Sequence, residues 1–311
     1  MKTVFVADLG GTKVAAAILD ATGKILARKT EPVDTSSKLA PAEQVARLAS
    51  ELGTYVGKAN AYISAAVAIP GLVRRNGTVW APNLPGWDKV PLARLLQTKL
   101  KVPVVVESDR NAAVLGETFA QKGAARGKTD VVVMIVGTGI GVGILSEGRL
   151  VRGAHELSGC AGWMVVTEQE SAERKQCGTL EAFTAGPGIA RSGREVFPKL
   201  TDARELADKA RNGNRKAKQV YQRAGTLLGY GVANLVSLFD PQVVVFAGGM
   251  SGAADLFWDD LLSAALDRAQ PLAAKQVRIK LSRLGGDANL YGCAKLAWEA
   301  APKARAATAG T

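Results

Sequence analysis

Short hydrophobic runs, each closed by a turn, open the chain. The glycine pair Gly10-Gly11 and the turn Ala21-Thr22-Gly23 separate them, so the pattern predicts β-strands at residues 3–7, 14–19 and 25–29. Hydrophobic residues three and four positions apart then predict an amphipathic helix over residues 41–57. Further along we predict a strand at 63–69, a helix at 92–100, a strand at 104–107 and a helix from 109 to about 121.

The opening pattern recurs about 130 residues later, which indicates an internal duplication. A strand, a glycine-rich turn, a second strand, a turn and a third strand are predicted again at residues 131–136, 140–145 and 150–151. A long helix (215–239), a buried strand (243–246) and a final helix (about 289–300) follow. We therefore expect two related α/β domains that face each other across a cleft. The N-terminal domain comprises residues 1–115 plus about 289–311, and the larger C-terminal domain comprises residues 116–288.

Composition narrows the class of protein. The chain has 311 residues, of which 47% are hydrophobic and 22% charged, which is typical of a folded globular protein. Its net charge of +12 is spread along the chain, and the one dense basic cluster, residues 211–218, lacks interleaved aromatic residues. We interpret this charge as a general attraction for phosphorylated ligands rather than as a nucleic-acid site.

Cysteine usage and the N-terminal residues bear on location. Cys160, Cys177 and Cys293 are odd in number and widely spaced, which argues against a disulfide framework and favours a reducing cytoplasm. The first ten residues resemble a strand rather than a signal peptide, and no hydrophobic run reaches the roughly 18–20 residues that cross a bilayer. We expect a cytoplasmic protein without a membrane partner.

The first glycine turn carries candidate chemistry. In the segment Asp8-Leu9-Gly10-Gly11-Thr12-Lys13 the glycines allow backbone N–H groups to approach phosphate oxygens, and Thr12 adds a hydroxyl donor. Asp8, at the end of a strand, can hold Mg²⁺ through water. The same residues also suit an ordinary tight turn, so this segment alone leaves both interpretations open.

Two later glycine turns strengthen the phosphate-binding interpretation. Gly137-Thr138-Gly139 begins a run of alternating glycines, and Gly248-Gly249 follows a buried strand. The run lacks the Gly-Lys-Ser/Thr ending of the P-loop and the spacing of the dinucleotide-binding fingerprint. Two such hairpins can bind a triphosphate, and the third turn can receive the nucleoside or the α-phosphate.

Phosphoryl transfer to an alcohol also needs a carboxylate near the attacking oxygen. Ser108-Asp109 lies where a strand becomes a helix, so Asp109 is the candidate base. Either residue would otherwise be interpreted as a helix N-cap.

Taken together, these motifs resemble the ROK family (repressors, open reading frames, kinases), a glucokinase-like branch of the actin and hexokinase ATPase superfamily. The similarity runs from about Val4 to about Leu296. It implies two ribonuclease-H-like domains flanking a cleft, ATP and Mg²⁺ as cofactors, a sugar substrate, and Asp109 as the base for the sugar 6-hydroxyl. Homodimers are common in the family. The segments that carry the resemblance are residues 8–13, 68–71, 108–117, 137–143, 180–182, 186–187 and 248–249.

The chain departs from the family's motifs at residues that contact the sugar in that family. Cys160 and Trp163 stand where the family has a sugar-binding glutamate and histidine, and Ser108 replaces an asparagine before the base. We interpret Cys160 as a small packing residue and Trp163 as an aromatic face for the sugar. The resemblance retains Glu181, Asn83 and Gly71 in the acceptor pocket.

Two further residues lie close to the changed positions. His155, the one histidine, is interpreted as an exposed turn residue, although it or Glu156 could replace the lost sugar contacts. Only Cys177 lies near the family's zinc cysteines, so no structural zinc is expected.

The sequence thus predicts an ATP-dependent kinase for a hexose or a modified hexose. One alternative is a sugar-sensing protein with little catalysis, because the sugar motif is degraded. Another is a kinase that uses polyphosphate, which the excess positive charge would suit.

Overall fold

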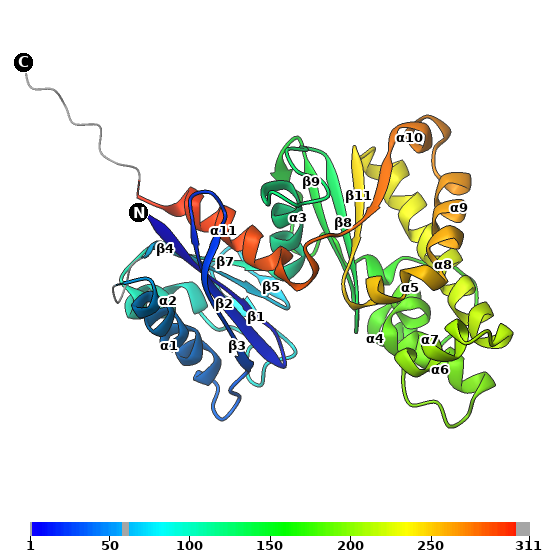
Figure 1. Ribbon diagram of the computed structural model, residues 1–311, viewed down its shortest axis with the longest axis horizontal. Coiled ribbons are helices and arrows are strands. Elements are labelled where there is room, and N and C mark those ends of the chain that lie inside the picture. Colours follow the sequence, from blue (N-terminus) through cyan, green and yellow to red (C-terminus); the bar gives the residue numbers. More distant parts are fainter. Residues whose placement is uncertain (1, 58–61, 303–311) are drawn as a thin grey trace, which may run out of the picture. The chain divides into compact units, whose positions relative to one another are not determined.

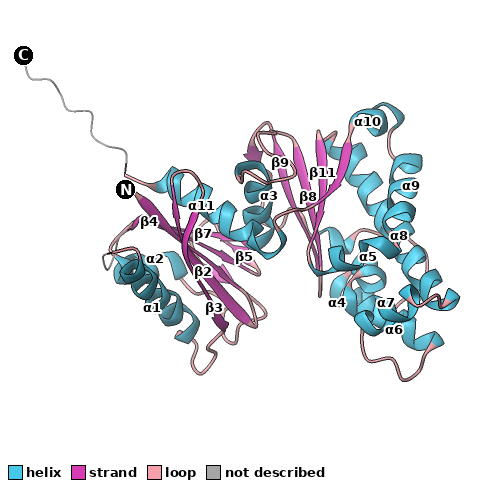
Figure 2. Ribbon diagram, viewed as in Figure 1, coloured by secondary structure: helices cyan, strands magenta, loops and turns pink. Residues whose placement is uncertain are grey.

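The computed structural model describes residues 2–57 and 62–302 (Figures 1 and 2). The chain forms two compact units, one comprising Met1–Gln121 with Asp287–Thr311 and the other comprising Lys122–Gly286. Residues 303–311, which we assigned to the N-terminal domain, lie outside the described part.

The first unit is built on a five-stranded sheet in the order β3-β2-β1-β4-β7. Its first three strands form an antiparallel meander, and β4 and β7 continue the sheet parallel to β1. The strands are β1 (Thr3–Leu9), β2 (Lys13–Asp20), β3 (Ile25–Pro32), β4 (Tyr62–Ile69) and β7 (Val104–Ser108). The carboxyl ends of β1, β4 and β7 therefore lie at one edge of the sheet, where ligands commonly bind in open α/β folds.

Helices cover both faces of this sheet. Helices α1 (Ala40–Tyr55) and α2 (Leu92–Leu100) pack their hydrophobic residues against one face. Helix α11 (Ala288–Ala300) packs on β1 and β4 from the other face and crosses α3 (Asp109–Phe119). A Cβ atom added to Gly292 of α11 would lie 1.8 Å from the Ala112 carbonyl oxygen, so the backbones of α11 and α3 are in direct contact.

A small hairpin follows β4, formed by β5 (Leu72–Val73) and β6 (Val79–Trp80). Gly71 precedes it, and a Cβ atom there would lie 2.1 Å from the Trp80 carbonyl oxygen. The glycine is thus required by the close approach of β6.

The second unit repeats the strand order of the first, with its sheet arranged as β10-β9-β8-β11-β12. Its strands are β8 (Val131–Val136), β9 (Ile140–Ser146), β10 (Arg149–Leu150), β11 (Val243–Ala247) and β12 (Arg278–Leu281). The predicted duplication is confirmed. Strand β12 was not predicted, because a four-residue run with two cations lacks a clear strand signal.

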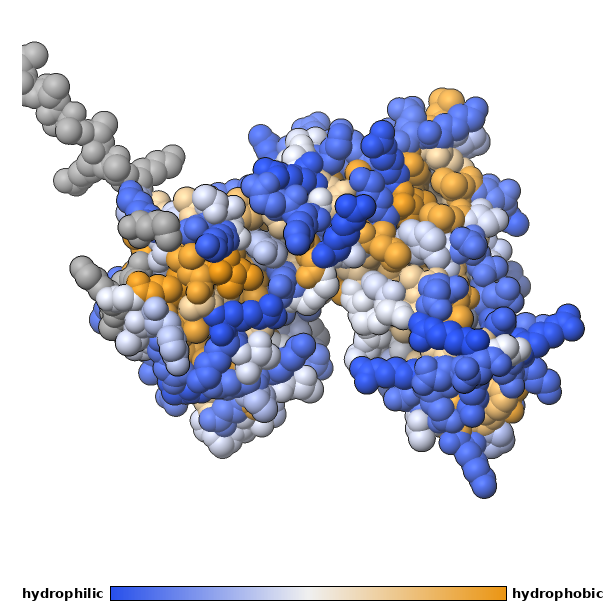
Figure 3. All heavy atoms as spheres, in the orientation of Figure 1, coloured by the Kyte–Doolittle hydropathy of each residue, from blue (hydrophilic) through white to orange (hydrophobic). Residues whose placement is uncertain are grey.

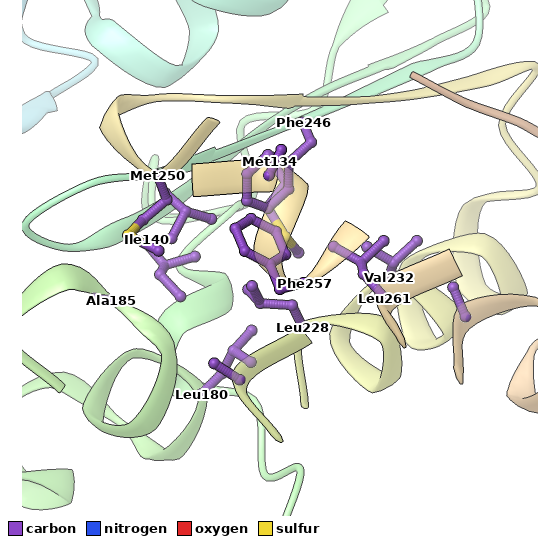
Figure 4. Close-up of a cluster of buried hydrophobic side chains, with 14 of the residues drawn as sticks. Met134, Ile140, Leu180, Ala185, Leu228, Val232, Phe246, Met250, Phe257 and Leu261 are labelled. Atoms are coloured by element: carbon purple, nitrogen blue, oxygen red, sulfur yellow. The ribbon is translucent and has the colours of Figure 1, made fainter. Parts of the chain in front are cut away.

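Long helices build the core of the second unit. Helix α8 (Arg215–Phe239) packs closely against α9 (Trp258–Arg268), because Gly225 and Gly229 leave room for the backbone and side chains of the segment 257–265. Side chains from the sheet and these helices meet in one cluster, shown in Figure 4. Hydrophilic side chains predominate on the surface in Figure 3.

The remaining helices of this unit pack mainly on α8, on α9 and on one another. They are α4 (Arg174–Cys177), α5 (Thr179–Thr184), α6 (Gly186–Val196), α7 (Ala203–Arg211) and α10 (Pro271–Gln276), together with the 3₁₀ segments η1 (Ala161–Trp163) and η2 (Gly249–Leu256); a third, η3 (Gly285–Asp287), leads into α11. Within residues 2–57 and 62–302 we find no helix with the length and hydrophobicity needed to cross a membrane.

Candidate active site

Two carboxyl groups lie near each other at the carboxyl edge of the first sheet. Asp8 lies near the end of β1, and Asp109 begins α3 directly after β7. Both residues keep some solvent access, but protein atoms surround their carboxyl groups. The pKa of Asp8 is raised to about 6, mainly by burial; the hydrogen bond from the Asn289 amide opposes this rise, the negative charge of Asp109 adds to it and the charge of Lys13 opposes it.

The carboxyl group of Asp109 is oriented by its own helix. The Arg110 N–H donates to its Oδ1 atom at 2.8 Å. Burial raises the pKa of Asp109, and the contact with Arg110 partly offsets that effect. A desolvated carboxylate with a raised pKa is a stronger proton acceptor than an exposed one, as a general base requires.

Asn289 is a site residue that the sequence motifs did not reveal. It lies in α11, and its side chain donates to the Asp8 carboxylate. One helical turn later, the Cys293 Sγ contacts the Ala7 carbonyl oxygen at 3.6 Å, so this face of α11 lies along the end of β1. Only the packing of a C-terminal helix on an N-terminal strand brings Asn289 to Asp8.

The hydroxyl group of Ser108 has no hydrogen-bond partner among the described residues. The residue is only 3% exposed, so this Oγ atom is also shielded from water. The helix-capping bond expected for an N-cap serine is also not formed. A buried hydroxyl without a partner is costly, so the Ser108 Oγ is a candidate contact for a bound ligand.

The first glycine turn is held by backbone hydrogen bonds. The Gly10 N–H donates to the Lys13 carbonyl at 2.9 Å, while Thr12 and Lys13 are exposed. A Cβ atom on Gly11 would lie 2.8 Å from the Asn83 Cβ, so the structure brings Asn83 beside this turn. The predicted acceptor residue and the predicted phosphate turn are therefore neighbours in the first unit.

In the second unit, two predicted turns and a helix N-terminus come together. The hairpin Gly137–Gly139 ends β8, and the turn at Gly248 ends the neighbouring parallel strand β11. Gly248 has φ +93°, which disfavours a side chain, and a Cβ atom there would lie 2.4 Å from the Val136 carbonyl oxygen. Both the backbone conformation and the lack of space therefore require glycine. The Gly186 N–H, at the start of α6, donates to the Gly137 carbonyl at 2.9 Å.

These turns face the first residues of two helical segments, η2 and α6, where unpaired N–H groups favour anions. The hydroxyl of Ser251, in the first turn of η2, is buried, and no residue in the described part of the chain forms a hydrogen bond with it. Sequence reasoning singled out the two glycines beside it but missed this serine.

The predicted sugar-side residues of the second unit lie in and around η1. Cys160 is exposed, so our interpretation of it as a packing residue is wrong. Most residues of the segment just before η1 are exposed or half-buried. The residue type of Cys160 does not by itself indicate this exposure. Trp163 is 55% exposed, which leaves its ring available to a ligand. His155 is an exposed turn residue, as expected, and Glu156 forms a 3.7 Å ion pair with Arg152.

Glu181 lies beside the Gly137–Gly139 hairpin. Its Oε2 atom accepts a hydrogen bond of 2.6 Å from the Ile140 N–H, directly after the Gly137–Gly139 hairpin. Cys177 is half-buried nearby, and its Sγ lies 3.4 Å from the Glu173 carbonyl oxygen. Among the described residues, no group of three or more His, Cys, Asp or Glu side chains is arranged to hold a metal ion.

A cavity of about 790 Å³ adjoins the end of η2 in the second unit. Its wall includes the ion pair between Arg211 and Asp255, whose Nη2 and Oδ1 atoms are 2.7 Å apart. Trp258 lines another side. The segment η2 thus runs from the Gly248-Gly249 turn to this cavity.

The chain is similar to known proteins over nearly its whole length. The family model described as the ROK family matches residues 4–300. The chain is 31% identical to a glucokinase of Thermotoga maritima over 93% of this chain and 95% of the relative. It is 33% identical to the bifunctional enzyme NanE/NanK of Brucella suis, over 93% of this chain and 52% of that protein.

Solved structures give the same result. A ROK hexokinase from Thermus thermophilus is similar with a TM-score of 0.84 and 32% identity, over 96% of this chain and 98% of that chain. A ROK family glucokinase from Streptomyces griseus, in complex with glucose and AMPPNP, has a TM-score of 0.72 and 27% identity, over 96% and 99% of the two chains. The predicted α/β fold of the actin-like ATPase type is confirmed.

Proposed function

Because the chain belongs to the ROK family, we propose that it is an ATP-dependent sugar kinase that phosphorylates a primary hydroxyl of a hexose or a modified hexose. The observation that carries this proposal is the desolvated Asp109 carboxyl group at the start of α3, beside the unpartnered hydroxyl of Ser108. The names of the relatives, glucokinase and hexokinase, support the reaction class.

Asp109 takes the proton from the attacking hydroxyl in this proposal. Burial raises the pKa of this carboxyl group, which makes its ionised form a stronger proton acceptor. The Arg110 N–H holds one carboxylate oxygen, which leaves the other for the sugar hydroxyl. Ser108 supplies a hydrogen bond to the acceptor and thereby satisfies its buried Oγ atom.

The phosphate groups of ATP are assigned to the glycine turns. Gly10, Gly11, Thr12 and Lys13 form one turn, and Gly137, Thr138 and Gly139 form the other. Backbone N–H groups in such turns bind phosphate oxygens because no side chain obstructs them. The start of η2 at Gly248-Gly249, with the unpartnered Ser251 hydroxyl, suits the α-phosphate, and the cavity beyond it suits the nucleoside.

Asp8 fits a role in holding Mg²⁺, because its carboxyl group is crowded by Asp109 and a cation relieves that repulsion. When bound, Mg²⁺ neutralises the charge that develops on the transferring phosphoryl group. Asn289 orients the Asp8 carboxylate for this task.

Residues of each unit are assigned to the acceptor. Asn83 lies against Gly11, while Gly71 owes its identity at least in part to packing against β6. Glu181, Cys160 and Trp163 complete the set, and the exposed indole ring offers an apolar face in place of an imidazole. We therefore expect an acceptor preference that differs from that of enzymes with the family's histidine. The cytoplasmic location and the homodimer expected above remain predictions.

The test is a coupled assay of ADP release with a panel of hexoses, amino sugars and N-acetylated sugars, comparing the parent with Asp109→Asn. Asparagine keeps the size of the side chain but cannot accept the proton. We expect kcat to fall by about 10²–10⁴-fold with little change in the affinity for AMPPNP. An Asp109→Asn protein with the parental kcat would refute the proposal.

The assay also separates the alternatives. Sugar-induced thermal stabilisation without turnover of any donor would favour a sensor, and turnover with polyphosphate but not with ATP would favour a polyphosphate kinase.

A further inference from the structure

The carboxylate of Glu181 connects helix α5 to the end of the Gly137–Gly139 hairpin. Its Oε2 atom lies 2.6 Å from the Ile140 nitrogen, and Ile140 is the first residue of β9 after the hairpin. Both ends of this hydrogen bond lie next to residues that are packed in the hydrophobic core. The side chains of Ile140 and Leu180, the neighbour of Glu181, are 7% and 0% exposed and belong to the core cluster in Figure 4.

Two glycines leave the space that the carboxylate occupies. A Cβ atom on Gly139 would lie 2.9 Å from the Glu181 Oε2. A Cβ atom on Gly162, in η1, would lie 2.9 Å from the same oxygen and 2.9 Å from the Glu181 Cβ. Gly139 has a separate reason to be a glycine, because it lies in a phosphate turn. Gly162 lies outside every proposed phosphate turn, and its lack of a side chain leaves room for the Glu181 side chain and for the Cys177 carbonyl oxygen, which would be 3.2 Å from that Cβ atom.

The hydrogen bond from the Ile140 N–H to Glu181 restricts the conformation of the hairpin. Because the Ile140 N–H is bonded within the protein, it serves as an anchor point of the hairpin rather than as a donor to a ligand. A glycine-rich turn loses much conformational freedom when it is ordered, so an anchor at its end lowers the entropic cost of binding phosphate.

We propose that Glu181 is a positioning residue for the donor phosphates, which holds the Gly137–Gly139 hairpin in its phosphate-binding conformation. This inference rests on the proposed kinase function and adds a donor-side role to the acceptor contact assigned to Glu181 above. The hairpin engages Oε2, and the Cys177 thiol also contacts the Glu181 carboxyl group.

The test compares Glu181→Gln with Glu181→Ala in the full-length protein. The two variants have the same charge, and only the glutamine can accept a hydrogen bond from the Ile140 N–H. The Kd of AMPPNP with saturating Mg²⁺ is measured by calorimetry in the absence of sugar, so that the acceptor contact of Glu181 does not contribute. We expect the alanine variant to bind AMPPNP about threefold to tenfold more weakly than the glutamine variant, as is typical for the loss of one hydrogen bond.

A second variant reaches the same contact from another element. Gly162→Ala places a methyl group where the Glu181 side chain lies, so it should displace the carboxylate and weaken AMPPNP binding by a similar factor. Its matched control is Gly286→Ala, because a Cβ atom on Gly286 has no neighbour within 4 Å. The control should bind AMPPNP as the parent does. Thermal unfolding of each variant verifies that it is folded, and Gly162→Ala serves as the test if Glu181→Ala does not fold.

The outcomes separate this inference from the proposed function. If the parent binds AMPPNP and phosphorylates a sugar, but the glutamine, alanine and Gly162→Ala proteins share one Kd, the positioning role is refuted and the kinase function stands. If the parent does not bind AMPPNP at all, the proposed function is refuted, and this inference with it.

Discussion

Replacing Asp8 with asparagine should make the protein more stable and less active. Burial and the neighbouring Asp109 raise the pKa of Asp8 from 3.8 to about 6. The folded protein therefore binds the Asp8 proton more tightly than the unfolded chain does. The stability that this provides is complete below pH 3.8 and is lost as the pH rises through about 6. Asparagine is neutral at every pH, so the Asp8→Asn protein should retain that stability.

The size of the effect follows from the shift. A pKa difference between 3.8 and about 6 corresponds to a gain of at most about 3 kcal/mol in the free energy of unfolding at pH 7.5, and to about 0.5 kcal/mol at pH 4. The asparagine Oδ1 can still accept from Asn289, so that contact does not oppose the gain. The kinase activity of Asp8→Asn should fall, because an amide holds Mg²⁺ more weakly than a carboxylate.

The assay is urea unfolding, followed by circular dichroism, at pH 4 and pH 7.5 with EDTA and without nucleotide. Asp20→Asn in the same unit is the control. Asp20 accepts hydrogen bonds from the Thr22 hydroxyl and from the N–H groups of Thr22 and Lys24, and these contacts lower its pKa. Its contribution is therefore present above pH 3.8 and lost as the pH falls through its lowered pKa, so Asp20→Asn should lose stability at pH 7.5. If Asp8→Asn gains equally at both pH values, or loses stability at pH 7.5, the reasoning is wrong.

Three further predictions concern α11 and the acceptor pocket. Asn289→Ala removes the hydrogen bond to Asp8 and should raise the Mg²⁺ concentration for half-maximal activity by about tenfold. The Kd of Mn²⁺, measured by electron paramagnetic resonance, should rise by the same factor, and an unchanged Kd would contradict this. Lys295→Ala on the same helix is the control and should have no effect. Gly292→Ala places a methyl group against the Ala112 carbonyl oxygen and should cost about 1–3 kcal/mol in unfolding experiments, whereas an unchanged melting temperature would show that α11 can move away at no cost. Trp163→His restores the residue type of the family and should lower KM for glucose without changing KM for ATP; a higher KM for glucose would indicate that the indole is part of the native acceptor site.

Local patterns predicted most of the elements. The strands at the start of each unit were predicted to within a few residues, because hydrophobic alternation and glycine turns act over short distances. The helix over 215–239 was predicted with its observed bounds, because its hydrophobic residues follow the helical period over a long segment. The short helices between residues 174 and 211 were left unassigned, since each is stabilised mainly by tertiary packing.

The candidate site also contains residues that the sequence could identify and residues that it could not. The glycine turns and Asp109 could be identified from the chain, because turn geometry and helix entry require particular residues at adjacent positions. Asn289 and Ser251 could not, because their significance lies in contacts with residues distant in the sequence or in the burial of a hydroxyl. The exposure of Cys160 likewise depends on what packs around η1 and not on the nature of the side chain.

By itself, then, the amino-acid sequence determined most of the strands, the longest helices, the duplication and the residue types that can bind phosphate or accept a proton. Only the tertiary structure decided the electrostatic state of Asp8 and Asp109, the contact of Asn289 with Asp8 and the contact of Glu181 with the hairpin. The physical reason is that turns and helices depend on neighbouring residues, whereas desolvation and hydrogen bonding depend on every atom within a few ångströms, from whichever part of the chain it comes.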